Sequence, residues 1–139
     1  MCKAPAALSM VNSQRGKGTH MNDLDDLEIY KEAMRIGDVV WTLVEPWHYF
    51  AKDTIGKQLV RSTDSVAANL AEGYGRFHFA DNKRFCYYSR DSLREALTWL
   101  TKAKERSLLS EDRFSELTKD ITILRKRLDS YIKSIGRTA

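Results

Sequence analysis

The chain has 139 residues, the length of one domain, and its 23 basic and 19 acidic side chains leave a net charge of +4. Hydrophobic residues make up 42% of the sequence and charged residues 30%, a balance typical of a globular rather than a disordered protein. No stretch reaches the about 18 uninterrupted apolar residues of a transmembrane helix, so no membrane partner is expected. Two cysteines, Cys2 and Cys86, exclude a disulfide framework and indicate a reducing, cytoplasmic location.

Residues 1–23 are predicted to be a flexible tail outside the folded domain. They show no apolar periodicity, and residues 1–20 contain the basic Lys3, Arg15 and Lys17 but no acidic residue. The stretch lacks the arrangement of a signal peptide, and a leader or a mis-called start codon would explain it. We therefore expect one folded domain over residues 24–135, followed by a short C-terminal tail of residues 136–139.

The first predicted helix runs from about Leu24 to Glu45 and carries two neighbouring apolar stripes. Their members recur at intervals of three and four residues, the spacing of one helix face. One stripe holds Leu27, Tyr30, Met34, Gly37, Trp41 and Val44, and the other holds Ile29, Ala33, Ile36, Val40 and Leu43. A single core needs one face, so the wide apolar surface indicates either a subunit contact or a deeply buried helix. Pro46 ends the helix, and residues 47–53 are predicted to be a loop.

Three further helices follow the same spacing. The second is predicted from about Thr54 to Tyr74 and is closed by Gly73 and Gly75, because glycine is common at helix C-termini. The third is predicted from about Ala80 to Arg106. Ser110 is expected to cap the fourth, whose apolar repeat extends from residue 114 to residue 135. Short connections make successive helices antiparallel, so the sequence predicts an all-α, up-down-up-down four-helix bundle.

Polar residues at helical spacing on the second and third helices are expected to face inward. They are Ser62, Ser65, Asn69, Glu72, Arg90, Ser92 and Glu95. Buried polar groups need partners, so we predict a structural network of hydrogen bonds across the interface, in which Glu72 reaches toward Arg90. A catalytic or ligand-binding core at the same positions is the alternative that the residues leave open.

The sequence offers no recognisable catalytic constellation. Its one Glu-x-x-His pair, Glu45 and His48, lacks the second pair that a di-iron bundle needs. His20 and His78 match no zinc-binding spacing, and no strand precedes a glycine-rich phosphate loop. Cys86 falls on an apolar stripe, where it is expected to be a core residue. We therefore predict no enzymatic activity, no metal and no cofactor.

The second helix carries a motif that resembles the signature of the 23S rRNA intervening-sequence proteins. The matching segments are Gln58–Ser62, Ser65–Arg76, Asp26–Tyr30, Arg84–Phe85, Ser89–Glu95 and Leu109–Glu111, so the resemblance covers about residues 24–135. It implies a small bacterial four-helix bundle to which no enzymatic activity is attached. Relatives include the accessory variability proteins of diversity-generating retroelements, so the resemblance also implies a homopentamer with nucleic acid and a reverse transcriptase or another protein as partners.

Basic residues are expected to gather where the second turn of the bundle meets the end of the fourth helix. The turn supplies Arg76, Lys83 and Arg84, and the helix end supplies Arg125, Arg127 and Lys133. Phe77, His78 and Phe79 lie in the same turn, where aromatic rings can stack on unpaired bases. We therefore predict weak, sequence-tolerant and salt-sensitive binding to RNA or DNA by a homo-oligomer. A protein–protein scaffold or adaptor that binds no nucleic acid is the alternative.

Overall fold

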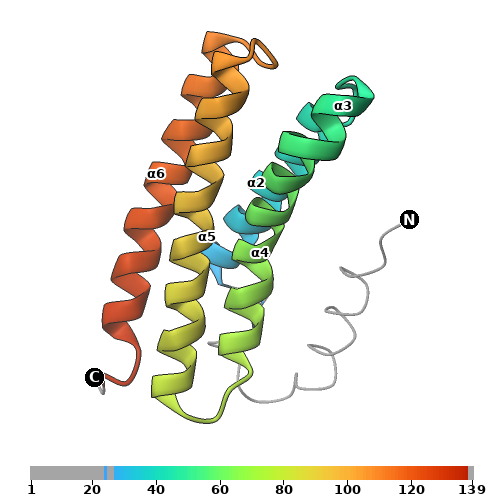
Figure 1. Ribbon diagram of the computed structural model, residues 1–139. Helices are drawn as coiled ribbons and strands as arrows, with labels where there is room; N and C mark the ends of the chain where they lie inside the picture. Colours follow the sequence, from blue (N-terminus) through green and yellow to red (C-terminus); the bar gives the residue numbers. More distant parts are fainter. Residues whose placement is uncertain (1–23, 25–26, 138–139) are drawn as a thin grey trace.

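The computed structural model describes Leu24 and residues 27–137, and this part of the chain forms four long helices with no β-strand. The long helices are α2 (Glu28–Val44), α4 (Lys57–Tyr74), α5 (Phe79–Glu105) and α6 (Glu111–Ser134). Successive long helices run in opposite directions (Figure 1), and α6 returns to pack against α2, which closes the ring of four. The all-α, up-down-up-down bundle predicted from the sequence is confirmed. The tail predicted for residues 1–23 lies outside the described residues.

Burial follows the apolar repeats of the sequence. On α6 the buried residues Leu117, Ile121, Leu124, Leu128 and Ile132 recur every three or four positions and form one stripe toward the core. Burial of each such side chain contributes about 1.5–3 kcal/mol, so the stripe is enough to hold α6 against its neighbours. None of the described helices is long and apolar enough to cross a membrane.

The start of α6 is fixed by its first residues, as predicted. The Ser110 hydroxyl accepts a hydrogen bond from the backbone N–H of Arg113 at 3.1 Å, which satisfies one of the free donors of the first turn. Glu111 and Asp112 lie in that turn, where the helix dipole favours negative charge.

The wide apolar surface of α2 is used mostly by the bundle itself. Ile29, Ala33, Ile36 and Val40 of one stripe are buried, and Val44 of the other is buried as well. Trp41 is the large apolar residue of α2 that remains outside the core, with 58% of its surface exposed. Leu27, Met34 and Leu43 are half-buried against the core, so burial within one chain accounts for most of this surface and leaves Trp41 exposed.

The loop predicted for residues 47–53 is wrong, because the chain is helical from Tyr49 onward. Helix α3 (Tyr49–Ala51) leads into η2 (Lys52–Gly56), a π-helical turn, and η2 continues directly into α4. His48 caps the start, since its Nδ1 accepts from the backbone N–H of Ala51 at 3.4 Å. The wider turn of a π-helix breaks the 3.6-residue period, so the apolar pattern could not reveal this helix start.

Gly73 and Gly75 do not act as the left-handed cap that usually places glycine at a helix end. Gly75 follows α4 with a right-handed φ of −79°. Gly73 is needed for close packing: a Cβ atom there would come within 2.8 Å of Asn82 Oδ1 and 2.9 Å of Phe85 Cβ. The glycine therefore lets the last turn of α4 approach the first turns of α5.

Candidate nucleic-acid interface

The turn between α4 and α5 gathers two arginines around one aromatic ring. The guanidinium carbon of Arg76 lies 4.8 Å from the centre of the Phe85 ring, and that of Arg84 lies 5.6 Å from the same point. Both distances are within the range of cation–π attraction, so the ring helps to hold the two cations together. Lys83, which precedes Arg84 in α5, is half-buried.

Each of these arginines also pairs with an acid three or four residues earlier in the chain. Arg76 Nη2 donates to Glu72 Oε2 at 2.8 Å, and Arg84 Nη2 lies 3.3 Å from Asp81 Oδ1. All four side chains are substantially exposed to water, so the pairs are weak and can open toward a phosphate. The acids nevertheless offset part of the positive field at the turn.

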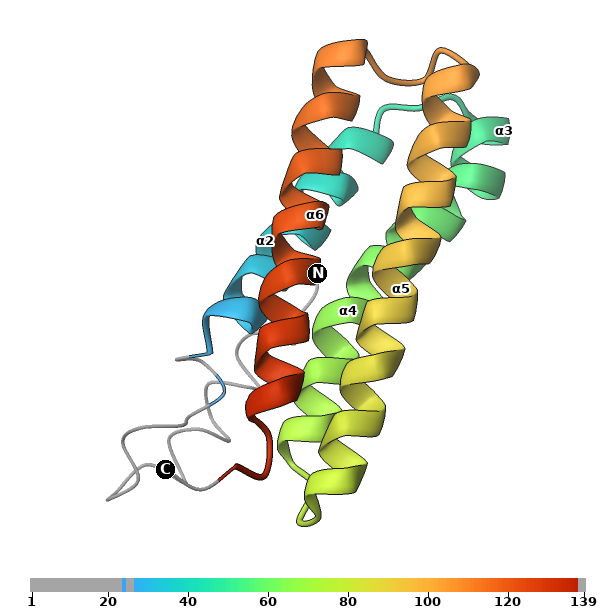
Figure 2. The ribbon, with the colours of Figure 1, turned by 90° about the vertical axis from the view of Figure 1, so that its left-hand side faces the viewer.

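Two phenylalanines at the same turn are largely exposed to solvent. Phe77 is 93% exposed and stands edge-on to the ring of His78, with 5.1 Å between their centres. Phe79 is 65% exposed and lies against Gly136, where a Cβ atom would be 3.2 Å from Phe79 Cδ2. The α4–α5 turn and the chain just after α6 are therefore in contact, as the sequence reasoning expected for this end of the bundle (Figure 2).

The basic residues of α6 do not form one patch. Arg125, Arg127 and Lys133 are exposed, but Arg125 and Arg127 are two residues apart and so point about 200° away from each other. Two ion pairs show which way each one faces. Asp129, one turn after Arg125, accepts a hydrogen bond from Arg90 of α5 at 3.0 Å. Asp120, two turns before Arg127, accepts one from Arg35 of α2 at 2.8 Å. Arg125 thus flanks α5, whereas Arg127 flanks α2.

The polar side chains of α4 that were predicted to bond across to α5 instead form hydrogen bonds within α4. Ser62 and Ser65 donate to the carbonyl oxygens of Leu59 and Arg61, at 3.0 and 2.7 Å. Asn69 donates to the Ser65 carbonyl oxygen at 2.9 Å. Short polar side chains reach the carbonyls three or four residues earlier in their own helix without any help from a neighbour.

The predicted approach of Glu72 to Arg90 is also wrong. Glu72 pairs with Arg76, and Arg90 pairs with Asp129 of α6. Glu95 is exposed and accepts from Trp99 Nε1 at 3.1 Å, and Ser92 is half-buried. A hydrogen bond between α4 and α5 does come from Ser89, which is fully buried and donates to the Val66 carbonyl oxygen at 2.8 Å.

Among the residues that the structure describes, no group of three or more His, Cys, Asp or Glu side chains is placed to hold a metal ion. Cys86 is fully buried, and burial raises the pKa of its thiol to about 11, so the thiolate that a nucleophile needs is disfavoured.

The fold defines a small all-α bundle protein, and the α4–α5 end of the bundle carries basic and aromatic side chains. The chain belongs to the 23S rRNA-intervening sequence protein family, whose model matches residues 25–130. Among solved structures it is similar to a protein of unknown function from the S23 ribosomal protein family of Bacteroides thetaiotaomicron. That likeness has a TM-score of 0.68 at 20% sequence identity and covers 76% of this chain and 98% of the other, so it supports the shared fold. No curated protein matches the chain.

Proposed function

We propose that this protein acts without catalysis, as a homo-oligomeric module that binds RNA or DNA weakly and with little sequence preference. The observation that carries the proposal is the α4–α5 turn, where Arg76 and Arg84 flank Phe85 next to the exposed Phe77 and Phe79. Cations that reach phosphates and rings that stack on unpaired bases are the two elements of sequence-tolerant single-strand binding.

The acidic residues paired with the two arginines limit the expected affinity for nucleic acid. Glu72 and Asp81 neutralise part of the charge of Arg76 and Arg84, so one copy has only a small positive excess at the turn. Useful affinity then requires several copies that act together on one nucleic acid, since linked weak contacts add through effective concentration. Arg125, Arg127 and Lys133 would supply further phosphate contacts from the sides of α6.

The test is a titration of the full chain with an RNA hairpin that has an unpaired loop, at low and at moderate salt. We expect binding at low salt that falls steeply as salt rises, and a loss of roughly tenfold or more for Arg76→Glu/Arg84→Glu. Arg125→Glu/Arg127→Glu should weaken binding less, because these two side chains face different sides of α6.

A matched control is the double reversal Arg113→Glu/Lys119→Glu near the start of α6, away from the turn. Both side chains are exposed, so the change alters net charge by the same amount with little effect on packing. If this control weakens binding as much as the turn variant does, the interaction is with net charge and the turn is not the site. Absence of binding by the parent at low salt would contradict the nucleic-acid proposal altogether.

The alternative, a protein scaffold or adaptor, is favoured by a different feature at the opposite end. Tyr49 and Phe50 of α3 are 79% and 73% exposed, and neighbouring exposed aromatic residues mark protein contacts. Such a surface can serve another copy of the chain, or a partner such as the reverse transcriptase that the family resemblance suggests. Capture of a protein partner by a chain that binds no RNA would favour this function.

A further inference from the structure

A pocket of about 400 Å³ lies between the end of α2 and the segment formed by η2 and the start of α4. It is at the opposite end of the bundle from the α4–α5 turn and shares no residue with the proposed nucleic-acid interface. Its volume is within the range of about 300–1,000 Å³ that is usual for small-molecule sites.

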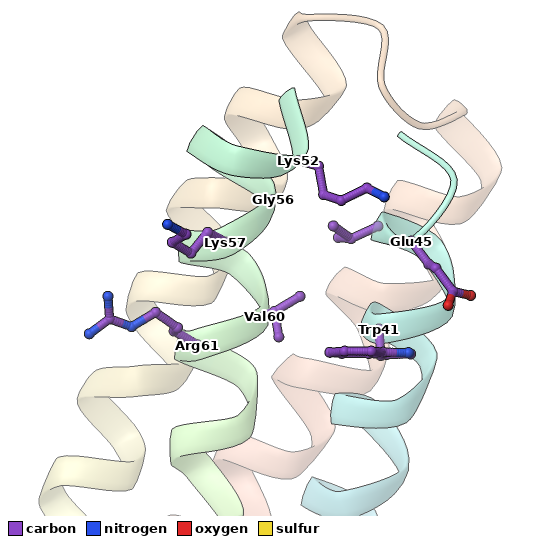
Figure 3. Close-up of a pocket in the computed structure, with 8 residues that line it drawn as sticks. Trp41, Glu45, Lys52, Gly56, Lys57, Val60 and Arg61 are labelled. Carbon is purple, nitrogen blue, oxygen red and sulfur yellow. The ribbon is translucent and has the colours of Figure 1, made fainter. Parts of the chain in front are cut away.

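The inner surface of the pocket is apolar and offers an aromatic ring face. Trp41 and Val44 line it from α2, and Val60 lines it from α4. Figure 3 shows the Trp41 ring as a flat plate, with Val60 pointing toward it across the pocket. Trp41 is also the large residue of α2 that the core leaves exposed, so its ring is open to a ligand.

Gly56 holds the two walls of the pocket together. A Cβ atom at this position would come within 2.7 Å of Val44 Cγ1 and 3.3 Å of Trp47 Cε3, so only glycine lets η2 approach the end of α2 this closely. Gly56 belongs to the π-helical turn, and single π-helical turns inside α-helices occur frequently at functional sites.

The charged groups around the pocket are mostly cationic. Lys52, Lys57 and Arg61 line it together with the single carboxylate of Glu45. In Figure 3 Lys52 extends from η2 across the pocket toward α2, whereas Lys57 and Arg61 turn outward on the other side of α4. Lys57 lies 3.2 Å from Asp53, while Lys52 and Arg61 have no ion pair with any residue that the structure describes.

We propose that this pocket binds a small organic anion with a flat aromatic body. The ring would stack on Trp41 between Val44 and Val60, and the anionic group would meet the Lys52 ammonium. Charge complementarity selects an anion over a cation, because Lys52 is the charged lining residue that extends across the pocket, whereas Glu45, Lys57 and Arg61 point away from it in Figure 3. This site is independent of the proposed nucleic-acid binding.

The experiment is a fluorescence titration of the full chain with anilinonaphthalene sulfonate, a flat aromatic anion. We expect saturable binding that Trp41→Ala and Lys52→Glu each weaken by about tenfold or more, and that Lys52→Arg leaves within about twofold of the parent. Neutral phenylnaphthylamine, which has the same rings without the sulfonate, should bind less tightly and should not distinguish Lys52→Glu from the parent.

Lys126→Glu is the matched control, because it reverses one exposed charge in the second half of α6, a helix that contributes no residue to the pocket, and should leave binding of the dye unchanged. Circular dichroism and thermal melting select variants with the parent's fold, since this dye also binds loosened cores. The proposal is overturned if folded Trp41→Ala and Lys52→Glu bind the dye as the parent does, or if the neutral compound binds as tightly as the anion. It is equally overturned if dye binds only to the single-chain form, because another copy of the chain then fills the pocket.

Discussion

The Asp64 carboxyl lies over Gly37, where α4 packs against α2. A Cβ atom on Gly37 would come within 2.7 Å of Asp64 Oδ1, so the carboxyl fills the space that a side chain would need. Burial raises the pKa of Asp64, and the nearby Asp38 carboxylate raises it further. The folded chain therefore holds a proton on Asp64 more tightly than the unfolded chain does.

This pKa shift predicts how stability depends on pH at Asp64. A raised carboxyl pKa stabilises the folded state below the ordinary pKa of aspartate, and that contribution is lost as pH rises through the raised value. Asp64→Asn should therefore be more stable than the parent at neutral pH, by well under about 1 kcal/mol, because the side chain as a whole is exposed and water screens its charge. The advantage should vanish at about pH 3, where the parent's carboxyl is protonated.

Urea denaturation at the two pH values measures the difference. Asp91→Asn on the exposed side of α5 is the control for the loss of one negative charge. A variant that is less stable than the parent at neutral pH would show that the Asp64 carboxylate makes a favourable interaction, contrary to the prediction.

Glu72 and Ser89, two polar side chains near the α4–α5 contact, should contribute very different amounts to the free energy of unfolding. Glu72 is exposed and pairs with Arg76 one turn away, so Glu72→Ala should cost no more than about 0.5 kcal/mol. Ser89 is fully buried, and Ser89→Val would remove its bond to Val66 and add bulk, which should cost about 1–3 kcal/mol. Urea denaturation of both variants compares the two costs. Equal losses would indicate that Glu72 belongs to an inward network after all.

At the scale of elements, the close approach of α4 and α5 depends on one glycine. Gly73→Ala would place a methyl group 2.8 Å from Asn82 Oδ1 and 3.0 Å from the Asn82 carbonyl oxygen, so the two helices must separate. We expect a loss of about 1–3 kcal/mol in the free energy of unfolding, measured with urea.

Gly75, two residues later, provides a matched control for this substitution. A Cβ atom there would have no neighbour closer than 3.7 Å, and its φ of −79° suits any residue. Gly75→Ala should therefore be neutral or stabilise the protein by up to about 1 kcal/mol, because alanine restricts the unfolded chain. If both alanines cost the same, the requirement for glycine is conformational rather than a matter of packing.

The same elements show what the sequence could and could not predict. The long helices were predictable because burial of a regular apolar stripe contributes more free energy than the helix propensities of single residues. The Ser110 cap was predictable because its hydrogen bond joins residues that are close in the sequence. The helical segment from Tyr49 was not, because histidine is an unusual cap and the π-helical turn shifts the period. The partners of Asn69 and Glu72 were missed because a face of a helix does not determine which rotamer its side chains adopt.

The candidate interface was predictable only in part for a similar reason. Topology brings the α4–α5 turn and the end of α6 to one end of the bundle, and this much follows from antiparallel helices with short connections. That Arg125 and Arg127 face different sides of α6 follows from their two-residue spacing, but the neighbouring helix that each one flanks depends on how α6 is rotated about its axis. That rotation is fixed by contacts with α5 and α2 that the spacing of basic residues does not encode.

For the whole molecule, the two ends of the bundle carry exposed aromatic residues of different character. Phe77 and Phe79 lie at the turn where Arg76 and Arg84 flank Phe85, whereas no arginine contacts the rings of Tyr49 and Phe50 among the described residues. Apolar contact between copies changes little with salt, whereas binding to phosphates weakens as counterions compete. Self-association and nucleic-acid binding should therefore be separable both by mutation and by ionic strength.

We expect light scattering to report an oligomer of the parent chain, with five copies as the stoichiometry that the family resemblance implies. Tyr49→Ser/Phe50→Ser should shift it toward single chains at both low and moderate salt, with little loss of stability because both rings are largely exposed. Phe77→Ser/Phe79→Ser should keep the parent's mass but weaken binding of the RNA hairpin, since each stacked ring contributes about 1–3 kcal/mol. If the parent has the mass of a single chain at all concentrations, multivalency cannot contribute to the proposed function. If instead the mass falls when Phe77 and Phe79 are replaced, the subunit contact lies at the α4–α5 turn.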